Sequence, residues 1–160
     1  MHEIRKDLGS GAAFYRALAA ELGALLAGEQ DVVANAANCA SLLYHSLSDV
    51  NWVGFYFLRD GELVVGPFQG KPACIRIALG KGVCGTAAAT RETQLVPDVH
   101  AFPGHIACDS ASRSEIVVPL IRRGELLGVL DIDSPRKDRF SETDRAGIEA
   151  LAQEFLARLD

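Results

Sequence analysis

The sequence predicts an α+β domain with a central, mostly antiparallel sheet. Two pairs of β-rich segments each surround a two-residue turn, Asp60-Gly61 and Arg123-Gly124, and such turns join neighbouring antiparallel strands. Helical patterns occupy both ends of the chain instead of alternating with the strands. The length of 160 residues suits one domain, so we expect residues 1–160 to form a single unit.

The helices are predicted from apolar residues at helical spacing. One pattern covers residues 12–27, with Gly28 as the expected C-cap, and a second covers 31–47. Cys39 falls within the second apolar stripe, so we expect it to be a core residue. Residues 141–144 match a capping box, which predicts that the last helix begins there.

Four strands are predicted, over residues 51–58, 62–68, 115–121 and 125–132. Alternation in the first strand places Trp52 and Tyr56 on one face, with Gly54 between them. The missing side chain at Gly54 would leave room for a small ligand between two aromatic walls. The alternative is an ordinary aromatic pair in the core.

Two irregular segments lie between the pairs of strands. Residues 80–85 form a glycine-rich loop, after which a short helix is expected to begin at Thr86. Residues 97–114 are rich in turn formers, and the segment is longer than an ordinary connection. Its apolar members favour an ordered lid over a disordered one.

The composition favours a protein that handles a small molecule. Twenty-one acidic residues against 16 basic ones give a net charge of −5, which argues against nucleic acid as the main partner. No apolar run reaches the roughly 18 residues of a membrane helix. The N-terminus lacks the hydrophobic segment of a secretion signal, so we expect a cytoplasmic protein with no membrane partner.

The cysteines indicate redox chemistry more than structural disulfides. Cys74, Cys84 and Cys108 lie in glycine-rich or turn-rich segments, where side chains reach solvent or a ligand. Cys108 follows His105 in a polar loop, a setting that can lower the pKa of a thiol, although Asp109 would raise it. Cys84 lies where the glycine-rich loop enters a helix, and helix N-terminal amides stabilise a thiolate or bind an anion. Each cysteine alone would suit a structural role, but three in similar settings favour a redox function.

Carboxyl groups gather at the end of the last predicted strand. Period 2 places Asp131 and Asp133 on one face, where like charges raise each other's pKa. The alternative is that Asp133 caps the following turn while Asp131 is solvated. Glu115 opens the preceding strand, and strict pairing around the turn would place it opposite Ile132, away from the aspartates. The register, or a bulge, therefore decides whether Glu115 joins them.

Several motifs spread over nearly the whole chain form one pattern. They include Asn51-Trp52-Val53-Gly54-Phe55-Tyr56, Gly82-Val83-Cys84-Gly85-Thr86-Ala87, Gly104-His105-Ile106-Ala107-Cys108-Asp109, Ser114-Glu115-Ile116-Val117 and Leu130-Asp131-Ile132-Asp133-Ser134. Together they resemble the free methionine-(R)-sulfoxide reductases, which are single-domain GAF proteins. The resemblance implies a GAF domain in which the N- and C-terminal helices pack on one face of the sheet and a ligand pocket lies on the other.

The resemblance also implies a reaction and the residues that carry it. The reaction would be the reduction of free L-methionine (R)-S-oxide through a cysteine sulfenic acid and an intramolecular disulfide, recycled by thioredoxin. Cys108 would be the nucleophile, with Cys74 and Cys84 as the resolving cysteines. Glu115, Asp131 and Asp133 would hold the substrate ammonium and the sulfoxide oxygen, and Trp52 and Tyr56 would line the pocket. We expect a homodimer without a cofactor.

Two other functions are compatible with parts of the sequence. A non-enzymatic GAF sensor would bind a small metabolite without turnover, but it has no need to keep three carboxyl groups beside a nucleophile. Zinc binding by His100, His105 and cysteines is disfavoured by their irregular spacing, so no metal is expected.

Overall fold

The computed structural model of the protein describes residues 11–105 and 110–160. Its helices are α1 (Ala12–Leu26), α2 (Val32–Ser46), α3 (Gly82–Thr90) and α4 (Glu142–Ala157), with a short 3-10 helix, η1 (Val99–Ala101). Its strands are β1 (Trp52–Arg59), β2 (Glu62–Gly70), β3 (Arg76–Ala78), β4 (Gln94–Val96), β5 (Ser114–Arg122) and β6 (Glu125–Ser134). No helix within these two ranges is both long and apolar enough to span a membrane.

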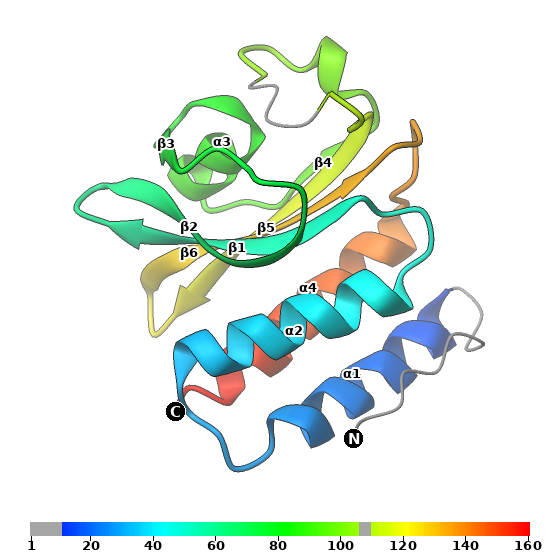
Figure 1. The fold of residues 1–160 in the computed structure, drawn as a ribbon, viewed down its shortest axis with the longest axis vertical. Coiled ribbons are helices and arrows are strands. Elements are labelled where there is room, and N and C mark those ends of the chain that lie inside the picture. The colour runs from blue at the N-terminus through cyan, green and yellow to red at the C-terminus, as the bar shows by residue number, and fades with distance from the viewer. Residues whose placement is uncertain (1–10, 106–109) are drawn as a thin grey trace.

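The six strands form one antiparallel sheet in the order β3-β2-β1-β6-β5-β4. Helices α1, α2 and α4 lie on one side of this sheet, while α3 and η1 lie on the other (Figure 1). The predicted α+β architecture is therefore confirmed, with the N- and C-terminal helices on one face. The short edge strands β3 and β4 were not predicted, because three residues carry too little alternation to be recognised in the sequence.

Local sequence signals explain where the longer elements begin and end. The side chain of Asp31 accepts a hydrogen bond from the Ala34 amide and caps α2. The predicted capping box of α4 is present, with Ser141 and Asp144 bonded reciprocally. Both tight turns have left-handed backbone at their two central residues, as hairpins of this length require.

Two apolar clusters occupy the two faces of the sheet. The helix-side cluster packs α1, α2 and α4 against alternate residues of the strands, and it includes Val53, Phe55 and the fully buried Cys39. Burial raises the pKa of the Cys39 thiol to about 12, as expected for a core cysteine. The pocket-side cluster includes Trp52 and Tyr56, so the predicted alternation in β1 is confirmed.

Candidate functional site

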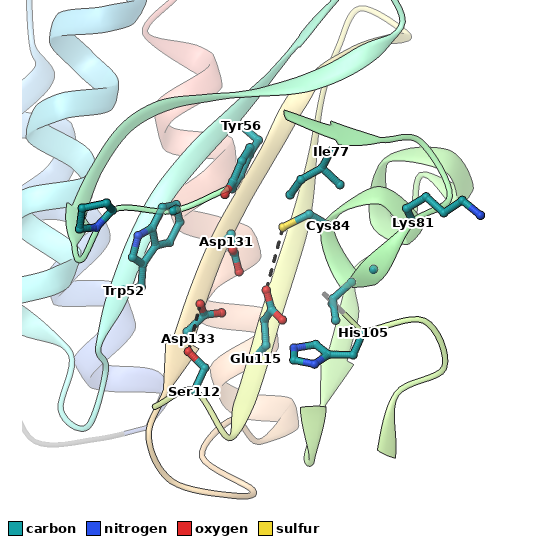
Figure 2. A pocket seen from close by; sticks show the side chains of 14 residues that line it. Trp52, Tyr56, Ile77, Lys81, Cys84, His105, Ser112, Glu115, Asp131 and Asp133 are labelled. Carbon is teal, nitrogen blue, oxygen red and sulfur yellow. Dashed lines mark hydrogen bonds between the residues drawn. The ribbon is translucent and has the colours of Figure 1, made fainter. Parts of the chain in front are cut away.

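A pocket lies on the sheet face opposite the three long helices. It is lined by β1, β5 and β6 of the sheet and, facing them, by the β2–β3 segment and α3 (Figure 2). Six of the predicted site residues contribute to its wall: Trp52, Tyr56, Cys84, Glu115, Asp131 and Asp133. Residues far apart in the sequence are therefore brought together at one place.

A bulge in the β5–β6 hairpin brings Glu115 to the same face as the two aspartates. Near the turn Ile121 pairs with Leu126, but the next residue of β5, Leu120, pairs with Gly128, so Leu127 is an extra residue. Beyond this bulge the register places Glu115 opposite Asp133 instead of Ile132. The strict pairing considered from the sequence is therefore wrong, and the bulge is the physical reason.

The same bulge determines which face of the sheet Leu126 and Leu127 occupy, and the prediction for these two residues is wrong. Uninterrupted alternation would put Leu127 on the face of Asp131 and Leu126 on the opposite one. Instead Leu126 packs against the pocket-side cluster and Leu127 against the helix-side cluster. Alternation holds only from Gly128 onward, where it correctly places Asp131 and Asp133.

The three carboxyl groups are withdrawn from water. Glu115 is 8% exposed and Asp131 is 5% exposed, while Asp133 is partly buried. Burial is the main cause that raises the pKa of each carboxyl well above its usual range, and repulsion among the three adds to it. Because each charge disfavours the next, the cluster binds protons more tightly than three separate, solvated carboxyl groups would.

Hydrogen-bond donors satisfy only part of this cluster. The Ser112 hydroxyl donates to Oδ2 of Asp133 over 3.4 Å, and it accepts a hydrogen bond from the Asn51 amide over 3.1 Å. Two further oxygens, Oδ1 of Asp131 and Oδ1 of Asp133, are buried and lack a hydrogen-bond partner in the described structure. Buried acceptors of this kind are costly to leave unpaired, so they are suited to a ligand that donates hydrogen bonds.

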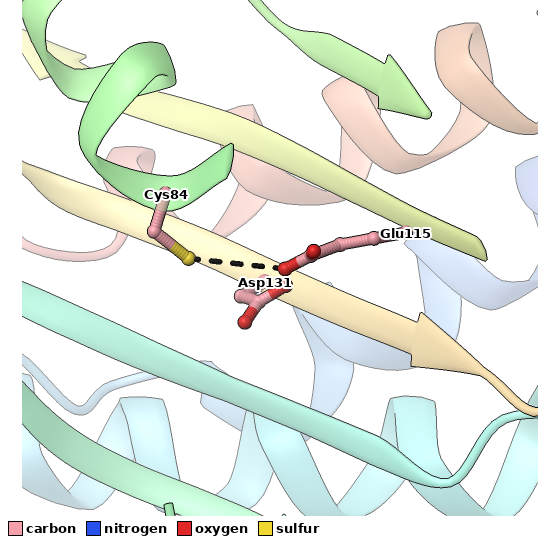
Figure 3. Close-up of side chains that lie close together, drawn as sticks. All are labelled: Cys84, Glu115 and Asp131. Atoms are coloured by element: carbon pink, nitrogen blue, oxygen red, sulfur yellow. Dashed lines mark hydrogen bonds between the residues drawn. The ribbon is translucent and has the colours of Figure 1, made fainter. Parts of the chain in front are cut away.

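Cys84 lies directly beside the carboxyl groups. Its sulfur is 4.0 Å from Oε2 of Glu115 (Figure 3), and the residue is only 4% exposed. The helix α3 begins at Gly82, earlier than the predicted Thr86, so Cys84 lies within its first turn. Of the two alternatives considered for this helix start, a stabilised thiolate is disfavoured, because burial and the neighbouring Asp131 and Glu115 raise the pKa of Cys84 well above its usual range.

One group of side chains in the described ranges has the geometry to hold a metal ion. The ligand atoms of Cys84, Glu115 and Asp131 all lie within 4.8 Å of one another. The group differs from the histidine and cysteine combination considered from the sequence. Its carboxyl oxygens are equally suited to an organic cation such as an ammonium group, which needs several acceptors at hydrogen-bond distance.

The aromatic wall is more closely packed than the sequence suggested. The Trp52 ring stacks on Tyr56, with centroids 5.8 Å apart, and on Phe68, with centroids 5.2 Å apart. A Cβ atom at Gly54 would collide with Cβ of Phe68 and would lie 2.7 Å from the Trp52 ring. The space above Gly54 is therefore filled by Phe68 and Trp52, which corrects the expectation that it is open to a ligand.

Both aromatic residues also hold the segment that carries Cys74. The indole nitrogen of Trp52 donates to the Lys71 carbonyl over 3.1 Å, and the Tyr56 hydroxyl donates to the Cys74 carbonyl over 3.0 Å. Cys74 is half-buried and disulfide-bonded, whereas Cys39 and Cys84 are free thiols. Cys108, the predicted nucleophile, lies outside the described residues.

Two polar residues of the pocket wall, Ser112 and His105, were among those not predicted as site residues from the sequence. Ser112 contacts Asp133 as described, but nothing distinguishes it from the other polar residues of its loop. His105 had been considered as a zinc ligand and as a neighbour of Cys108, and the structure places it in the pocket wall (Figure 2). Its pKa is lowered by burial and by the nearby His100, so the imidazole favours the neutral form.

The hydrogen bond from Tyr56 gives a first testable prediction. In Tyr56→Phe the ring remains, but the Cys74 carbonyl loses its anchor, and such a bond contributes about 0.5–1.5 kcal/mol. We expect dithiothreitol to reduce the Cys74 disulfide about 2- to 10-fold faster, measured by thiol labelling and mass spectrometry. Tyr44→Phe on α2 is the matched control, since Tyr44 packs near the helix-side cluster. Equal rates in both variants would show that this bond does not restrain Cys74.

Comparison with known proteins places the chain in a family. The profile of the GAF domain matches residues 10–159. Free methionine-R-sulfoxide reductase of Escherichia coli is 52% identical over 142 residues, which cover 89% of this chain and 86% of the relative. The crystal structure of the reductase of that name from Neisseria meningitidis, in complex with its substrate, is 45% identical, with a TM-score of 0.94 over 99% of this chain and 96% of the other.

A third similar protein carries a different name. A chain from Burkholderia vietnamiensis with a provisional GAF sensor name is 60% identical, with a TM-score of 0.91 over 94% of this chain and 99% of the other. The extent of the profile match and the identity and coverage of the reductases are sufficient to assign the family. The chain belongs to the GAF domain family, in the branch of the free methionine-R-sulfoxide reductases.

Proposed function

We propose that this protein reduces free L-methionine (R)-S-oxide to methionine. The observation that carries the proposal is the set of three carboxyl groups around one pocket, two of them buried and one partly buried. Two of the three have a buried oxygen that lacks a hydrogen-bond partner in the described structure. The similar reductases named above support it, because one of them forms a complex with its substrate.

The carboxyl cluster explains why the substrate would be a free amino acid. An ammonium group donates up to three hydrogen bonds and compensates the buried negative charge of Glu115, Asp131 and Asp133. A residue within a peptide has a neutral amide at this position and a chain attached to it. Such a substrate would leave the carboxyl groups unpaired, at a cost of several kcal/mol.

The same cluster supplies an acid for the reaction. A sulfoxide sulfur accepts a thiolate readily only when its oxygen is hydrogen-bonded or protonated, and a carboxyl with a raised pKa provides that proton. We assign this role to Glu115 or Asp133. The sulfur of Cys108 attacks, the oxygen passes from the substrate to Cys108, and the products are methionine and a sulfenic acid. The substrate sulfur gains two electrons and Cys108 loses two.

The sulfenic acid then condenses with a thiol, which releases water and forms a disulfide. We assign this step to Cys74 first, because Cys74 is the disulfide-bonded cysteine among those described. Cys84 is a second resolving cysteine, adjacent to Glu115. A dithiol protein such as thioredoxin restores both thiols by exchange, and the pathway needs no cofactor or metal. A cytoplasmic homodimer remains part of the proposal.

The proposal is tested by turnover on the separated diastereomers of free methionine sulfoxide. NADPH consumption in a thioredoxin-coupled assay should be at least about 100-fold faster with the R than with the S form. N-acetyl-methionine sulfoxide amide, which lacks the ammonium group, should not be turned over measurably. Binding of the R form without turnover would favour the sensor function, which the name of the Burkholderia relative suggests. Equal rates with both diastereomers would contradict the assignment.

A further inference from the structure

The surface around β3 differs from the rest of the described molecule in its exposed apolar side chains. Of the described residues, three large hydrophobic side chains are exposed: Val33, Ile75 and Leu79. Val33 lies alone on α2, whereas Ile75 and Leu79 lie at the two ends of β3. Ile75 is 67% exposed and directly follows Cys74 in the chain. We call Lys71, Ile75, Leu79 and Lys81 the β3 rim.

The backbone of the β3 rim is held in place, so its side chains form a defined surface. The amide of Val65 donates to the Ile75 carbonyl over 2.9 Å, and the amide of Lys81 donates to the Ala78 carbonyl over 3.1 Å. The Lys71 carbonyl is held by Trp52, as described above. β3 is also an outermost strand of the sheet, so a partner can approach it from the side.

The charge of the β3 rim is opposite to that of the whole protein. All charged residues between positions 63 and 91 are basic, although the chain has a net charge of −5. Arg76 pairs with Glu62 over 2.6 Å. Lys71 and Lys81 are exposed, and no residue of the described ranges forms an ion pair with them. A positively charged rim with an apolar centre fits an acidic protein with an apolar contact surface.

We propose that a small acidic dithiol protein docks on the β3 rim, with Ile75 as its apolar anchor, and attacks the sulfur of Cys74. This inference rests on the proposed function, because it assigns the place where that reaction is recycled. Cys74 is half-buried, and Cys84 and Cys39 are buried, so Cys74 is the described cysteine most open to a protein reductant.

The exchange balances in two steps. A thiolate of the docked protein attacks Sγ of Cys74, which forms a mixed disulfide and releases the other cysteine of the original bond as a thiolate. The second thiol of the docked protein then attacks its own sulfur in the mixed disulfide and releases Cys74. The docked protein leaves as a disulfide and loses two electrons, which the two cysteines of this chain gain.

The test compares a protein reductant with a small one. In Ile75→Asp, we expect kcat/KM for thioredoxin to fall about 10- to 100-fold, as for the loss of a central interface anchor. Turnover with dithiothreitol should stay within about twofold, which also shows that the variant is folded. Val33→Asp on α2 removes an apolar side chain that is also exposed but lies on the other side of the sheet from α3, and both of its rates should stay within about twofold.

The charge of the rim is tested separately. In Lys71→Glu, the thioredoxin rate should fall and become less dependent on ionic strength. Lys71 is chosen because Lys81 also lines the pocket. A parallel loss with both reductants, or no loss with thioredoxin, would overturn the proposal. The oligomeric state of Ile75→Asp, measured by light scattering, gives a further outcome. If this variant changes from dimer to monomer while the thioredoxin rate is unchanged, the rim contacts a second copy of the chain and the docking proposal is overturned.

A trapping experiment tests the docking of the reductant separately from the proposed reaction on methionine sulfoxide. A thioredoxin that lacks its second cysteine forms a mixed disulfide with the oxidised protein, whether or not methionine sulfoxide is a substrate. This bond should form at Cys74, about 10-fold more slowly in Ile75→Asp than in Val33→Asp. Equal trapping rates in these two variants would contradict docking, while a lack of turnover in the unmodified protein with dithiothreitol would contradict the proposed function instead.

Discussion

Replacing Cys108 by serine is expected to reduce turnover on free methionine (R)-sulfoxide by at least about 1,000-fold, as for the loss of other covalent nucleophiles. Serine cannot accept the sulfoxide oxygen, because its oxygen has no reducing equivalents to give. The carboxyl cluster belongs to β5 and β6, so substrate binding should survive. NADPH consumption in the thioredoxin-coupled assay measures turnover, and calorimetry with the R form measures binding.

Cys39→Ser is the matched control for this experiment. Cys39 is fully buried in the helix-side cluster, on the opposite face of the sheet from the pocket. Its replacement should lower the free energy of unfolding but leave the turnover of the folded protein within about twofold. Substantial activity in Cys108→Ser would remove Cys108 from the role of nucleophile. The assignment would then pass to Cys74 or Cys84.

Replacing Asp131 by asparagine is expected to lower the activity of the protein while raising its stability at neutral pH. The variant keeps the shape of the side chain but removes one of the charges that would pair with the substrate ammonium. We expect kcat/KM to fall about 100-fold or more, chiefly through a higher KM, since removing one partner of a buried charge pair costs about 2–5 kcal/mol. Steady-state kinetics with the R form measures both parameters.

The same change should stabilise the protein at neutral pH. A carboxyl whose pKa is raised by folding binds protons more tightly in the folded state, so its contribution to stability is lost as pH rises from its unfolded pKa, about 4, towards the raised value. Asparagine does not ionise, so Asp131→Asn avoids this loss of stability at higher pH. The free energy of unfolding at pH 7 should increase by about 1–2 kcal/mol, and the gain should shrink towards pH 4.

Asp144→Asn is the control, because it should change the free energy of unfolding at pH 7 in the opposite direction. Hydrogen bonds from Ser141 and Tyr15, together with Arg139, lower the pKa of Asp144 despite its partial burial. Its contribution is therefore present above pH 4 and is lost as pH falls, so Asp144→Asn should destabilise the protein at pH 7. Urea unfolding between pH 4 and pH 8 compares the two variants. A loss of stability in Asp131→Asn at pH 7 would contradict the account of the cluster as strained by mutual repulsion.

Much of the fold could be predicted because it depends on local signals. The two tight turns, the capping box of α4 and the alternation in β1 are each determined by a few adjacent residues. Alternation also predicted that Asp131 and Asp133 share a face. The pKa of each is raised, chiefly by burial, and then by the charge of Asp133 on Asp131 and of Glu115 on Asp133. The family resemblance assigned eight residues to one pocket, and six of them line it, while Cys74 is not among its lining residues and Cys108 lies outside the described residues.

Other features depend on contacts that local patterns do not contain. Whether Glu115 joined the aspartates depended on one extra residue, Leu127, and nothing in its neighbours marks a bulge. The pKa of Cys84 could not be judged from its position at a helix start, because its environment is determined by carboxyl groups from β5 and β6. The hydrogen bonds from Trp52 and Tyr56 to the β2–β3 segment join residues on different strands and loops.

The bulge separates the facing of the carboxyl cluster from the exact length of the hairpin. Leu127 is the residue that the bulge takes up, so deleting Leu127 would leave strict pairing in which Glu115 still lies opposite Asp133. Keeping Leu127 without a bulge would instead shift the register by one residue and turn Glu115 to the face covered by the helices. Insertions and deletions in this hairpin should therefore be judged first by whether an irregularity in the strand absorbs them.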